Sequence, residues 1–241
     1  MNKYEHKVVL VTGSSRGVGL EIAKYFLAEG ARVIGLSRGE NNNITHEAYT
    51  HFPLDLGNPE AIQSCFRKNI PTQFKQIDIL INNAAVMTSQ YAMILPLKNV
   101  SDMININLLG LFMVSRETAK LMRGKSPSRI INIGSMASSL EPMGDSVYAA
   151  TKAAIITLAN VMGKELAMYQ VTCNTLGISA IETDMLNSHN DTAKVKIKEI
   201  LNSMPIPRMA EMDDILNVID FFASDRSSYI TGQTIYLGGI N

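Results

Sequence analysis

The chain has 241 residues, 46% of them hydrophobic, which suits one domain with a full buried core. Lysine plus arginine and aspartate plus glutamate both number 22, so no global field favours nucleic acid or an anionic membrane as a partner. The two cysteines and four histidines are scattered, which argues against a metal site and fits a reducing compartment. Because no apolar run resembles a secretory signal or a membrane span, we expect a cytoplasmic protein.

Short β-branched runs alternate with segments of helical periodicity in the first half of the chain. In order they are the strand "KVVLVTG", the helix "GVGLEIAKYFLAEG", the strands "ARVIGLSR" and "YTHFPLDL", the helix "NPEAIQSCFRK" and the strand "IDILINNAA". Asn58 before Pro59 predicts a helix cap with proline in the first helical position. The lack of hairpin signals favours a parallel sheet covered by helices on both faces.

The second half continues the same alternation. It predicts a helix from about Val100 to Met122, the strand "RIINIGS", a helix from about Ser146 to Tyr169, the strand "VTCNTLG", a helix from Met212 to Ala223 and the strand "TIYLGG". No repeat or linker interrupts the pattern. We therefore predict one α/β domain over residues 1–241, a doubly wound Rossmann fold with about seven parallel strands flanked by helices.

The stretch "TGSSRGVG" follows the first strand and opens a helix. Glycines in this position let the backbone turn tightly and approach a pyrophosphate, whose charge the helix N-terminus stabilises. Turns before helices also use glycine for conformational reasons alone, but the strand–loop–helix–strand context favours dinucleotide binding. The predicted cofactor-binding residues of this loop are Gly13, Ser15, Arg16, Gly17, Val18 and Gly19.

The second strand ends in "GLSR", without the carboxylate that would bind the free ribose 2′-hydroxyl of NAD. Arg38, together with Arg16 in the glycine loop, can instead pair with a 2′-phosphate. We therefore predict NADP, as NADPH, while Glu40 leaves NAD open as the alternative. The missing carboxylate also argues against a Rossmann-type methyltransferase.

The stretch "DSVYAATKAAI" places Tyr148 four residues before Lys152 in a predicted helix. Residues four apart share a helix face, so the lysine ammonium can lie near whatever the phenol touches. The pair fits an acid catalyst and the group that tunes it, but the spacing alone also fits chance.

Several motifs together resemble the short-chain dehydrogenase/reductase family over essentially the whole chain. They are the glycine trio, "NNAA" at 82–85, Asn107 in "ININLLG", Ser135 in "INIGS" and the Tyr148/Lys152 pair. Within that family, the chain is most similar to the 3-oxoacyl-[acyl-carrier-protein] reductases.

The resemblance implies transfer of a hydride to a ketone, with Tyr148 protonating the developing alkoxide. Lys152 would lower the pKa of the phenol and hold the nicotinamide ribose, since an ammonium about 4 Å away is worth about 4 kcal/mol at an effective dielectric near 20. Ser135 would hydrogen-bond the substrate carbonyl, and Asn107 would hold a water that links Lys152 to solvent. The implied catalytic set is Asn107, Ser135, Tyr148 and Lys152.

The resemblance also implies cofactor contacts beyond the glycine loop. Asp55 would bind the adenine, alanines in "NNAA" would line the cofactor trough, and Ile181 and Thr183 would bind the carboxamide or diphosphate. The further implied residues are Asp55, Leu56, Asn82, Ala84, Ala85, Tyr148, Lys152, Ile181 and Thr183. One departure leaves the nearby loop geometry open, because Ile178 and Ser179 stand where the family usually has Pro-Gly, and Gly177 comes two residues early.

Residues 186–204 lie where the family has its substrate lid and predict an amphipathic helix, although a surface helix packed on the sheet fits the same pattern. Met136, Leu140, Met143 and Met185 fit either an apolar wall for an acyl chain or core positions. Arg123, Lys125 and Arg129 form a candidate basic patch for an acidic acyl carrier protein.

We therefore expect an NADP-dependent oxidoreductase that reduces a ketone, foremost a 3-oxoacyl thioester in fatty acid biosynthesis, to the 3-hydroxyacyl product. The alternatives are a reductase or dehydrogenase of a specialised keto or secondary alcohol metabolite, from a polyketide or sugar pathway, and a non-catalytic NADP-binding sensor. The length disfavours a nucleotide-sugar epimerase. The long helices around 100–122 and 146–169 are apolar on more than one face, which predicts a homotetramer, with a dimer as the alternative.

Overall fold

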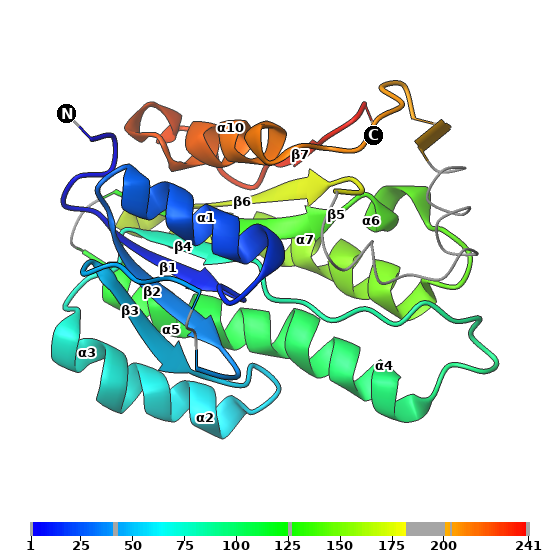
Figure 1. The fold of residues 1–241 in the computed structure, drawn as a ribbon, viewed down its shortest axis with the longest axis horizontal. Helices are drawn as coiled ribbons and strands as arrows, with labels where there is room; N and C mark the ends of the chain where they lie inside the picture. The colour runs from blue at the N-terminus through cyan, green and yellow to red at the C-terminus, as the bar shows by residue number, and fades with distance from the viewer. Residues whose placement is uncertain (1, 41–42, 125–126, 182–200, 203, 240–241) are drawn as a thin grey trace.

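The computed structural model describes residues 2–40, 43–124, 127–181, 201–202 and 204–239. Within them, seven strands form one sheet in the order β3-β2-β1-β4-β5-β6-β7, and every pairing is parallel (Figure 1). The strands are β1 Val8–Thr12, β2 Arg32–Ser37, β3 Tyr49–Pro53, β4 Ile79–Asn82, β5 Ser128–Ser135, β6 Val171–Ile178 and β7 Thr234–Tyr236. The predicted seven-stranded doubly wound fold is confirmed.

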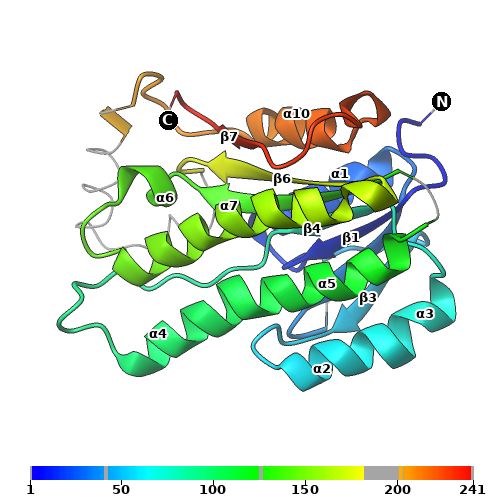
Figure 2. The same cartoon turned by 180° about the vertical axis from the view of Figure 1, so that it is seen from behind.

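Helices cover both faces of the sheet. Helices α1 and α10 pack on one face, and the longer helices α4, α5 and α7 lie with α2 and α3 on the other, as Figure 2 shows from behind. The helix bounds are α1 Gly17–Ala28, α2 Pro59–Ser64, α3 Ile70–Gln73, α4 Leu97–Ile104, α5 Leu111–Met122, α6 Ala137–Leu140, α7 Ser146–Leu166 and α10 Met212–Ala223. The short helix α6, directly after β5, is not indicated by the sequence pattern.

The sheet separates two hydrophobic clusters. Phe26 of α1 and Phe222 of α10 fill one cluster, while Met113 of α5 and Met162 of α7 belong to the other. All eight residues of β5 are buried, because a parallel strand with helices on both faces has no solvent side. Burial on both faces also explains why β1 and β4 read as nearly continuous apolar runs rather than alternating ones.

The predicted long helix after β4 is interrupted by a wider turn. A π-helical segment, Asn105–Gly110, joins α4 to α5, and the helix begins at Leu97. A side chain at Gly110 would overlap the backbone oxygen of Leu56, so the wide turn passes directly over the loop after β3. Single π-turns inside helices are frequent at functional sites, and this one contains Asn107.

The cap predicted at Asn58 is also present, because its Oδ1 accepts a hydrogen bond of 2.9 Å from the Ala61 amide. Strands β1 and β4 are neighbours at the centre of the sheet, and the chain leaves them toward opposite sides. In open α/β sheets, ligands bind in the crevice at the carboxyl ends of such strands. The loops after β1, β4 and β5, which carry most of the predicted site residues, all begin at this edge.

Candidate active site

The glycine loop after β1 needs its glycines for two different reasons. Gly13 and Gly17 have positive φ angles of 70° and 56°, a conformation that side chains rarely adopt. At Gly19 a Cβ would overlap the backbone oxygen of Gly13, so the first turn of α1 packs directly on the loop. The loop therefore has the tight geometry that the sequence predicted.

Among the residues that the structure describes, the N-cap side chain of α1 leaves the first turn of the helix uncapped. Arg16, the N-cap residue, has extended backbone and makes no capping hydrogen bond with its side chain, and the first turn holds no acidic residue. A Cβ at Gly17 would meet no atom within 4 Å, so the space above the turn is open. These features fit the diphosphate of a dinucleotide, because the amides of a first helical turn and the helix dipole favour an anion there.

The turn after β4 is fastened to the glycine loop. Thr12 Oγ1 accepts hydrogen bonds of 3.0 Å from the amides of Asn83 and Ala84. Asn83 Nδ2 in turn donates to the Thr12 backbone oxygen at 3.0 Å. This bracing role of Thr12 and Asn83 was not predicted, although both residues adjoin predicted motifs.

Asn82 lies below this turn and is buried. Its Nδ2 donates to Ser115 Oγ and to Asn132 Oδ1, both at 2.8 Å. Both amide protons are used, so Asn82 ties the end of β4 to β5 and α5. Ala84 and Ala85 are partly exposed, and contact of Asn82, Ala84 and Ala85 with a cofactor stays a prediction.

The predicted ribose-phosphate site lies after β2. Arg16 and Arg38 are both exposed at this end of the sheet, and no carboxylate stands in β2. His51 of β3 braces the segment that carries Arg38, with its Nε2 2.7 Å from the Gly39 backbone oxygen. Asn43 Nδ2 donates to the Ser15 backbone oxygen at 2.8 Å, which links this segment to the glycine loop.

Asp55 and Leu56 follow β3 at the same edge. The carboxylate of Asp55 is exposed and accepts a hydrogen bond of 2.9 Å from the Gly57 amide, whereas Leu56 is buried. The turn thus holds Asp55 at the rim, and its contact with the adenine stays a prediction.

The structure brings Ser135 and Tyr148 together. Ser135 is the last residue of β5 and Tyr148 lies in α7, and the Ser135 hydroxyl is close enough to the phenol to affect its pKa. Ser135 Oγ also accepts a bond of 3.1 Å from the Ala137 amide, which orients the hydroxyl and leaves its proton free to donate. Burial raises the pKa of Tyr148, the neighbouring Ser135 hydroxyl lowers it, and nearby Asp145 raises it.

Lys152 lies one turn after Tyr148 and is buried. Its Nζ donates to the Ile133 backbone oxygen at 2.7 Å and lies 5.8 Å from the centroid of the Tyr148 ring. Burial lowers the pKa of Lys152 to about 8, because desolvation disfavours the charged form. The lowering of the Tyr148 pKa by this ammonium stays a prediction.

Asn107 in the π-helical turn is fully buried and uses its side chain for bracing. Oδ1 accepts from the Val86 amide at 2.8 Å, and Nδ2 donates to the Val86 oxygen at 2.9 Å and to Thr151 Oγ1 at 3.3 Å. Asn107 therefore joins the turn after β4 to α7 beside Lys152. Its predicted part in a water link from Lys152 to solvent stays a prediction.

The departure after β6 has a clear structural form. Strand β6 continues to Ile178, whose backbone oxygen accepts a bond of 2.9 Å from the Met136 amide, and Ser179 is buried. Ile181 pairs with Ala210 in an isolated bridge, and its contact with a carboxamide stays a prediction. Thr183, Met185 and Lys125 lie outside the described residues, as does the predicted lid 186–204 except at 201–202 and 204.

Two surface predictions can be judged on the described residues. Met143 is 78% exposed and Leu140 is 39% exposed, so neither is a core residue. The basic patch is wrong for Arg129, which is 2% exposed and donates to the backbone oxygens of Ser128 and Ser224. Arg129 is also the second residue of β5, about 20 Å from Ser135 at the other end of the strand, given about 3.3 Å per residue.

The chain matches known proteins along nearly its full length. The family model of the short chain dehydrogenase matches residues 7–194. The 3-oxoacyl-[acyl-carrier-protein] reductase FabG of Salmonella typhimurium is 34% identical over 241 residues, which cover 98% of this chain and 97% of the relative. The reductase of the same name from Vibrio cholerae is 35% identical over 240 residues, with the same two coverages.

Solved structures agree. The aldohexose dehydrogenase of Thermoplasma acidophilum in ligand-free form superposes with a TM-score of 0.88 at 27% identity, covering 99% of this chain and 95% of that one. A short chain dehydrogenase of Leptospira borgpetersenii with bound NAD+ gives a TM-score of 0.86 at 26% identity, with coverages of 98% and 92%.

The described residues contain no group of three or more potential metal ligands. No helix among them is both long enough and apolar enough to cross a bilayer. The glycine loop, the Ser135, Tyr148 and Lys152 side chains at one sheet edge, and the full-length matches point to one conclusion. The chain belongs to the short-chain dehydrogenase/reductase family, whose cofactor is a nicotinamide dinucleotide, and is an oxidoreductase acting on CH–OH or C=O groups.

Proposed function

We propose that the protein is an NADPH-dependent reductase of the ketone of a 3-oxoacyl thioester, which it converts to the 3-hydroxyacyl product. The observation that carries the proposal is the meeting of Ser135, Tyr148 and Lys152 at the carboxyl edge of the sheet, beside the glycine loop. The similarity to reductases named for 3-oxoacyl-carrier substrates supports this substrate class. An acyl carrier protein is the corresponding partner.

Each side chain has a distinct task in this reaction. A bound NADPH would supply the hydride to the carbonyl carbon. Ser135, whose Oγ is held by the Ala137 amide, donates its proton in a hydrogen bond to the carbonyl oxygen. Tyr148 transfers its proton to the same oxygen as negative charge develops, and its raised pKa keeps it protonated until then.

Lys152 is the third side chain of the proposed site. Its Nζ is fixed by the Ile133 oxygen, which leaves further protons for the nicotinamide ribose and for tuning the phenol. With a pKa of about 8, the amine exists in both protonation states near neutral pH and is suited to returning a proton to Tyr148.

The preference for NADPH is supported by charge at the ribose-phosphate site. Arg16 and Arg38 are exposed there, and β2 provides no carboxylate to bind a free 2′-hydroxyl. Guanidinium groups bind phosphate by charge-assisted hydrogen bonds. Glu40, also exposed, is a feature of this segment that favours NADH instead.

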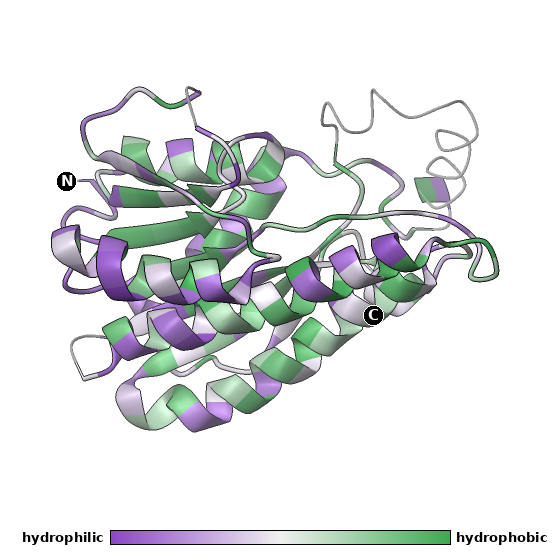
Figure 3. Ribbon diagram, turned by 90° about the horizontal axis from the view of Figure 1, so that it is seen from below, coloured by the Kyte–Doolittle hydropathy of each residue, from purple (hydrophilic) through white to green (hydrophobic). Residues whose placement is uncertain are grey.

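A homotetramer is proposed from apolar side chains on the outer helices. Figure 3 views the helical layer from below, where hydrophobic residues recur along the outer helices. Ile104 and Phe112 are exposed on the helix that runs through α4 and α5, and Val161 is exposed on α7. These positions would be buried by subunit packing.

The first experiment is NADPH oxidation with an acetoacetyl thioester, offered on carrier protein and on coenzyme A, with NADH as the cofactor control. Tyr148→Phe should abolish turnover and leave the Kd for NADPH unchanged, since only the acid is removed. Tyr229→Phe, a change at a phenol that is 98% exposed, is the matched control. An unchanged rate in Tyr148→Phe would refute the proposed acid.

A second substrate class follows from the structural match to an aldohexose dehydrogenase. A specialised sugar or other secondary alcohol would be oxidised by the same groups acting in reverse. Reduction of NADP+ by aldohexoses, with no turnover of acetoacetyl thioesters, would favour this reading. Tight NADPH binding without turnover of either class would instead indicate a non-catalytic sensor.

A further inference from the structure

Tyr236 of β7 packs directly on the backbone of β6. It is paired in register with Gly177, and a Cβ built on Gly177 would lie 2.6 Å from Cε1 of the Tyr236 ring. No real side chain tolerates such an approach, so the ring occupies the space that any other residue at position 177 would fill. The early glycine of "NTLGIS" is therefore explained by the tyrosine on the neighbouring strand.

The hydroxyl of Tyr236 is linked to Ser135 by hydrogen bonds through Ser138. It lies 2.8 Å from Ser138 Oγ, and Ser138 Oγ donates to the backbone oxygen of Ser135 at 2.7 Å. A serine hydroxyl has one proton, and that of Ser138 is used on Ser135. Tyr236 must therefore be the donor in its bond with Ser138, so the chain of bonds runs from Tyr236 through Ser138 to Ser135.

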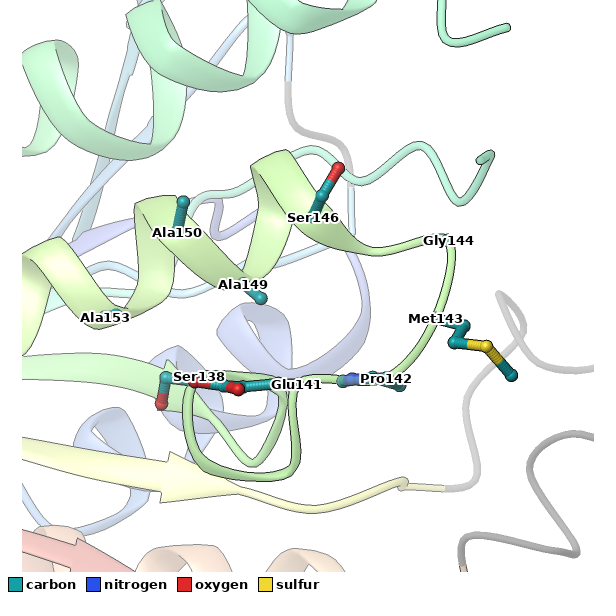
Figure 4. A pocket seen from close by; sticks show the side chains of 9 residues that line it. All are labelled: Ser138, Glu141, Pro142, Met143, Gly144, Ser146, Ala149, Ala150 and Ala153. Carbon is teal, nitrogen blue, oxygen red and sulfur yellow. The ribbon is translucent and has the colours of Figure 1, made fainter. Parts of the chain in front are cut away.

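Ser138 also stands at an accessible place. It lines a cavity of about 400 Å³ between the turn around α6 and the face of α7 that carries Ala149 and Ala153. Figure 4 shows its hydroxyl directed away from α7. The cavity leaves room at Ser138 for a conservative change, which the test below uses.

The turn after Ser135 is thus held from three sides. The Ala137 amide donates to Ser135 Oγ, and the Met136 amide donates to the Ile178 oxygen of β6. The Ser138 hydroxyl donates to the Ser135 backbone oxygen and is itself hydrogen-bonded to Tyr236 of β7. Where the family usually has Pro-Gly, this chain has Ile178 and Ser179, and so lacks the fixed φ that proline would provide. Bracing from Tyr236 offers another source of rigidity at the same turn.

We propose that Tyr236, acting through Ser138, is a positioning residue that holds Ser135 for its hydrogen bond to the substrate oxygen. The arrangement requires glycine at position 177, because a Cβ there would overlap the Tyr236 ring. The inference rests on the proposed function of Ser135. Donation from Tyr236 polarises the Ser138 hydroxyl and strengthens its bond to Ser135, so the loss of either hydroxyl loosens the same turn.

The test compares Tyr236→Phe, Ser138→Ala and the double variant with the wild-type enzyme. We expect each single change to lower kcat about tenfold, the scale of one lost hydrogen bond, with KM and the Kd for NADPH within about twofold. The double variant should be no slower than the slower single variant, because both act on one chain of bonds. Ser138→Thr, which keeps the hydroxyl, should retain activity, and Tyr229→Phe is the control.

A lowered Tm with unchanged kcat would overturn the proposal and leave only a structural role. Additive losses in the double variant would overturn it too. A second measurement does not depend on turnover: amide hydrogen exchange over residues 133–138 should be faster in Tyr236→Phe than in Tyr229→Phe. Unchanged exchange refutes the positioning of Ser135, whereas faster exchange in a protein that reduces no ketone refutes the proposed function alone.

Discussion

Lys152→Met separates the cost of burying the lysine from its catalytic use. Burial lowers the pKa of the amine from 10.5 to about 8. Since one pKa unit corresponds to about 1.4 kcal/mol, keeping the buried amine protonated costs about 3 kcal/mol of folding free energy. Methionine removes that cost but leaves the Ile133 oxygen without its 2.7 Å donor, which costs about 1–3 kcal/mol. At pH 7 the inactive variant should therefore be equal to the wild type or up to about 2 kcal/mol more stable.

The pH dependence gives the sharper test. Between pH 8 and 10.5 the unfolded chain holds a proton on Lys152 that the folded chain has lost, so stability rises with pH in that window. The wild type should gain about 2 kcal/mol relative to Lys152→Met between pH 7 and 9.5. Burial raises the pKa of Tyr148, so this neighbouring phenol keeps its proton over the range and does not obscure the difference.

Urea unfolding of both proteins without cofactor, at equal concentration and at the two pH values, measures this difference directly. Other groups titrate alike in both proteins and cancel in the subtraction. If the difference in unfolding free energy between the two proteins is the same at pH 7 and pH 9.5, the pKa of Lys152 is not lowered, and the proposed return of a proton to Tyr148 loses its basis.

Two further predictions concern the cofactor. In Gly19→Ala the new Cβ would overlap the Gly13 oxygen, so the Kd for NADPH should rise at least tenfold in fluorescence titrations. Gly124→Ala is the control, because Gly124 has a positive φ but open space around it. This change should cost about 1 kcal/mol of stability and leave the Kd for NADPH unchanged. Arg38→Ala should raise the KM for NADPH about tenfold to a hundredfold and leave the KM for NADH unchanged. Arg226→Ala, a change at another exposed arginine, is the control. Equal effects of Arg38→Ala on both cofactors would contradict a 2′-phosphate contact.

The fold could be predicted because its signals are local. Buried parallel strands read as continuous apolar runs, and the helices between them have their own period. Tyr148 and Lys152 were also accessible from sequence, since they are four residues apart on one helix. Ser135 was identified through the family resemblance, and its position agrees with the rule that ligands bind at the carboxyl ends of strands.

The bracing contacts could not be predicted because they join distant positions. Thr12 meets Asn83 across 71 residues, and no spacing rule connects them. Arg129 was assigned to a surface patch because two other basic residues stand close to it in the sequence, yet the backbone oxygen of Ser224, 95 residues later, accepts from its guanidinium. A charged residue in a sequence predicts an exposed side chain only where the fold places no buried hydrogen-bond acceptor beside it.

Gly177 shows how the same limit affects a functional interpretation. From the sequence, a glycine two residues early with Ile178 and Ser179 behind it leaves the loop by the nicotinamide in doubt and mildly favours a sensor that has lost turnover. In the structure that glycine makes room for Tyr236, and the residues that follow extend β6 and bind the turn after Ser135. The departure is then one part of a coupled arrangement of Gly177, Tyr236 and Ser138. Because a protein that only bound NADPH would gain nothing from fixing the Ser135 hydroxyl, this arrangement favours an enzyme that turns over.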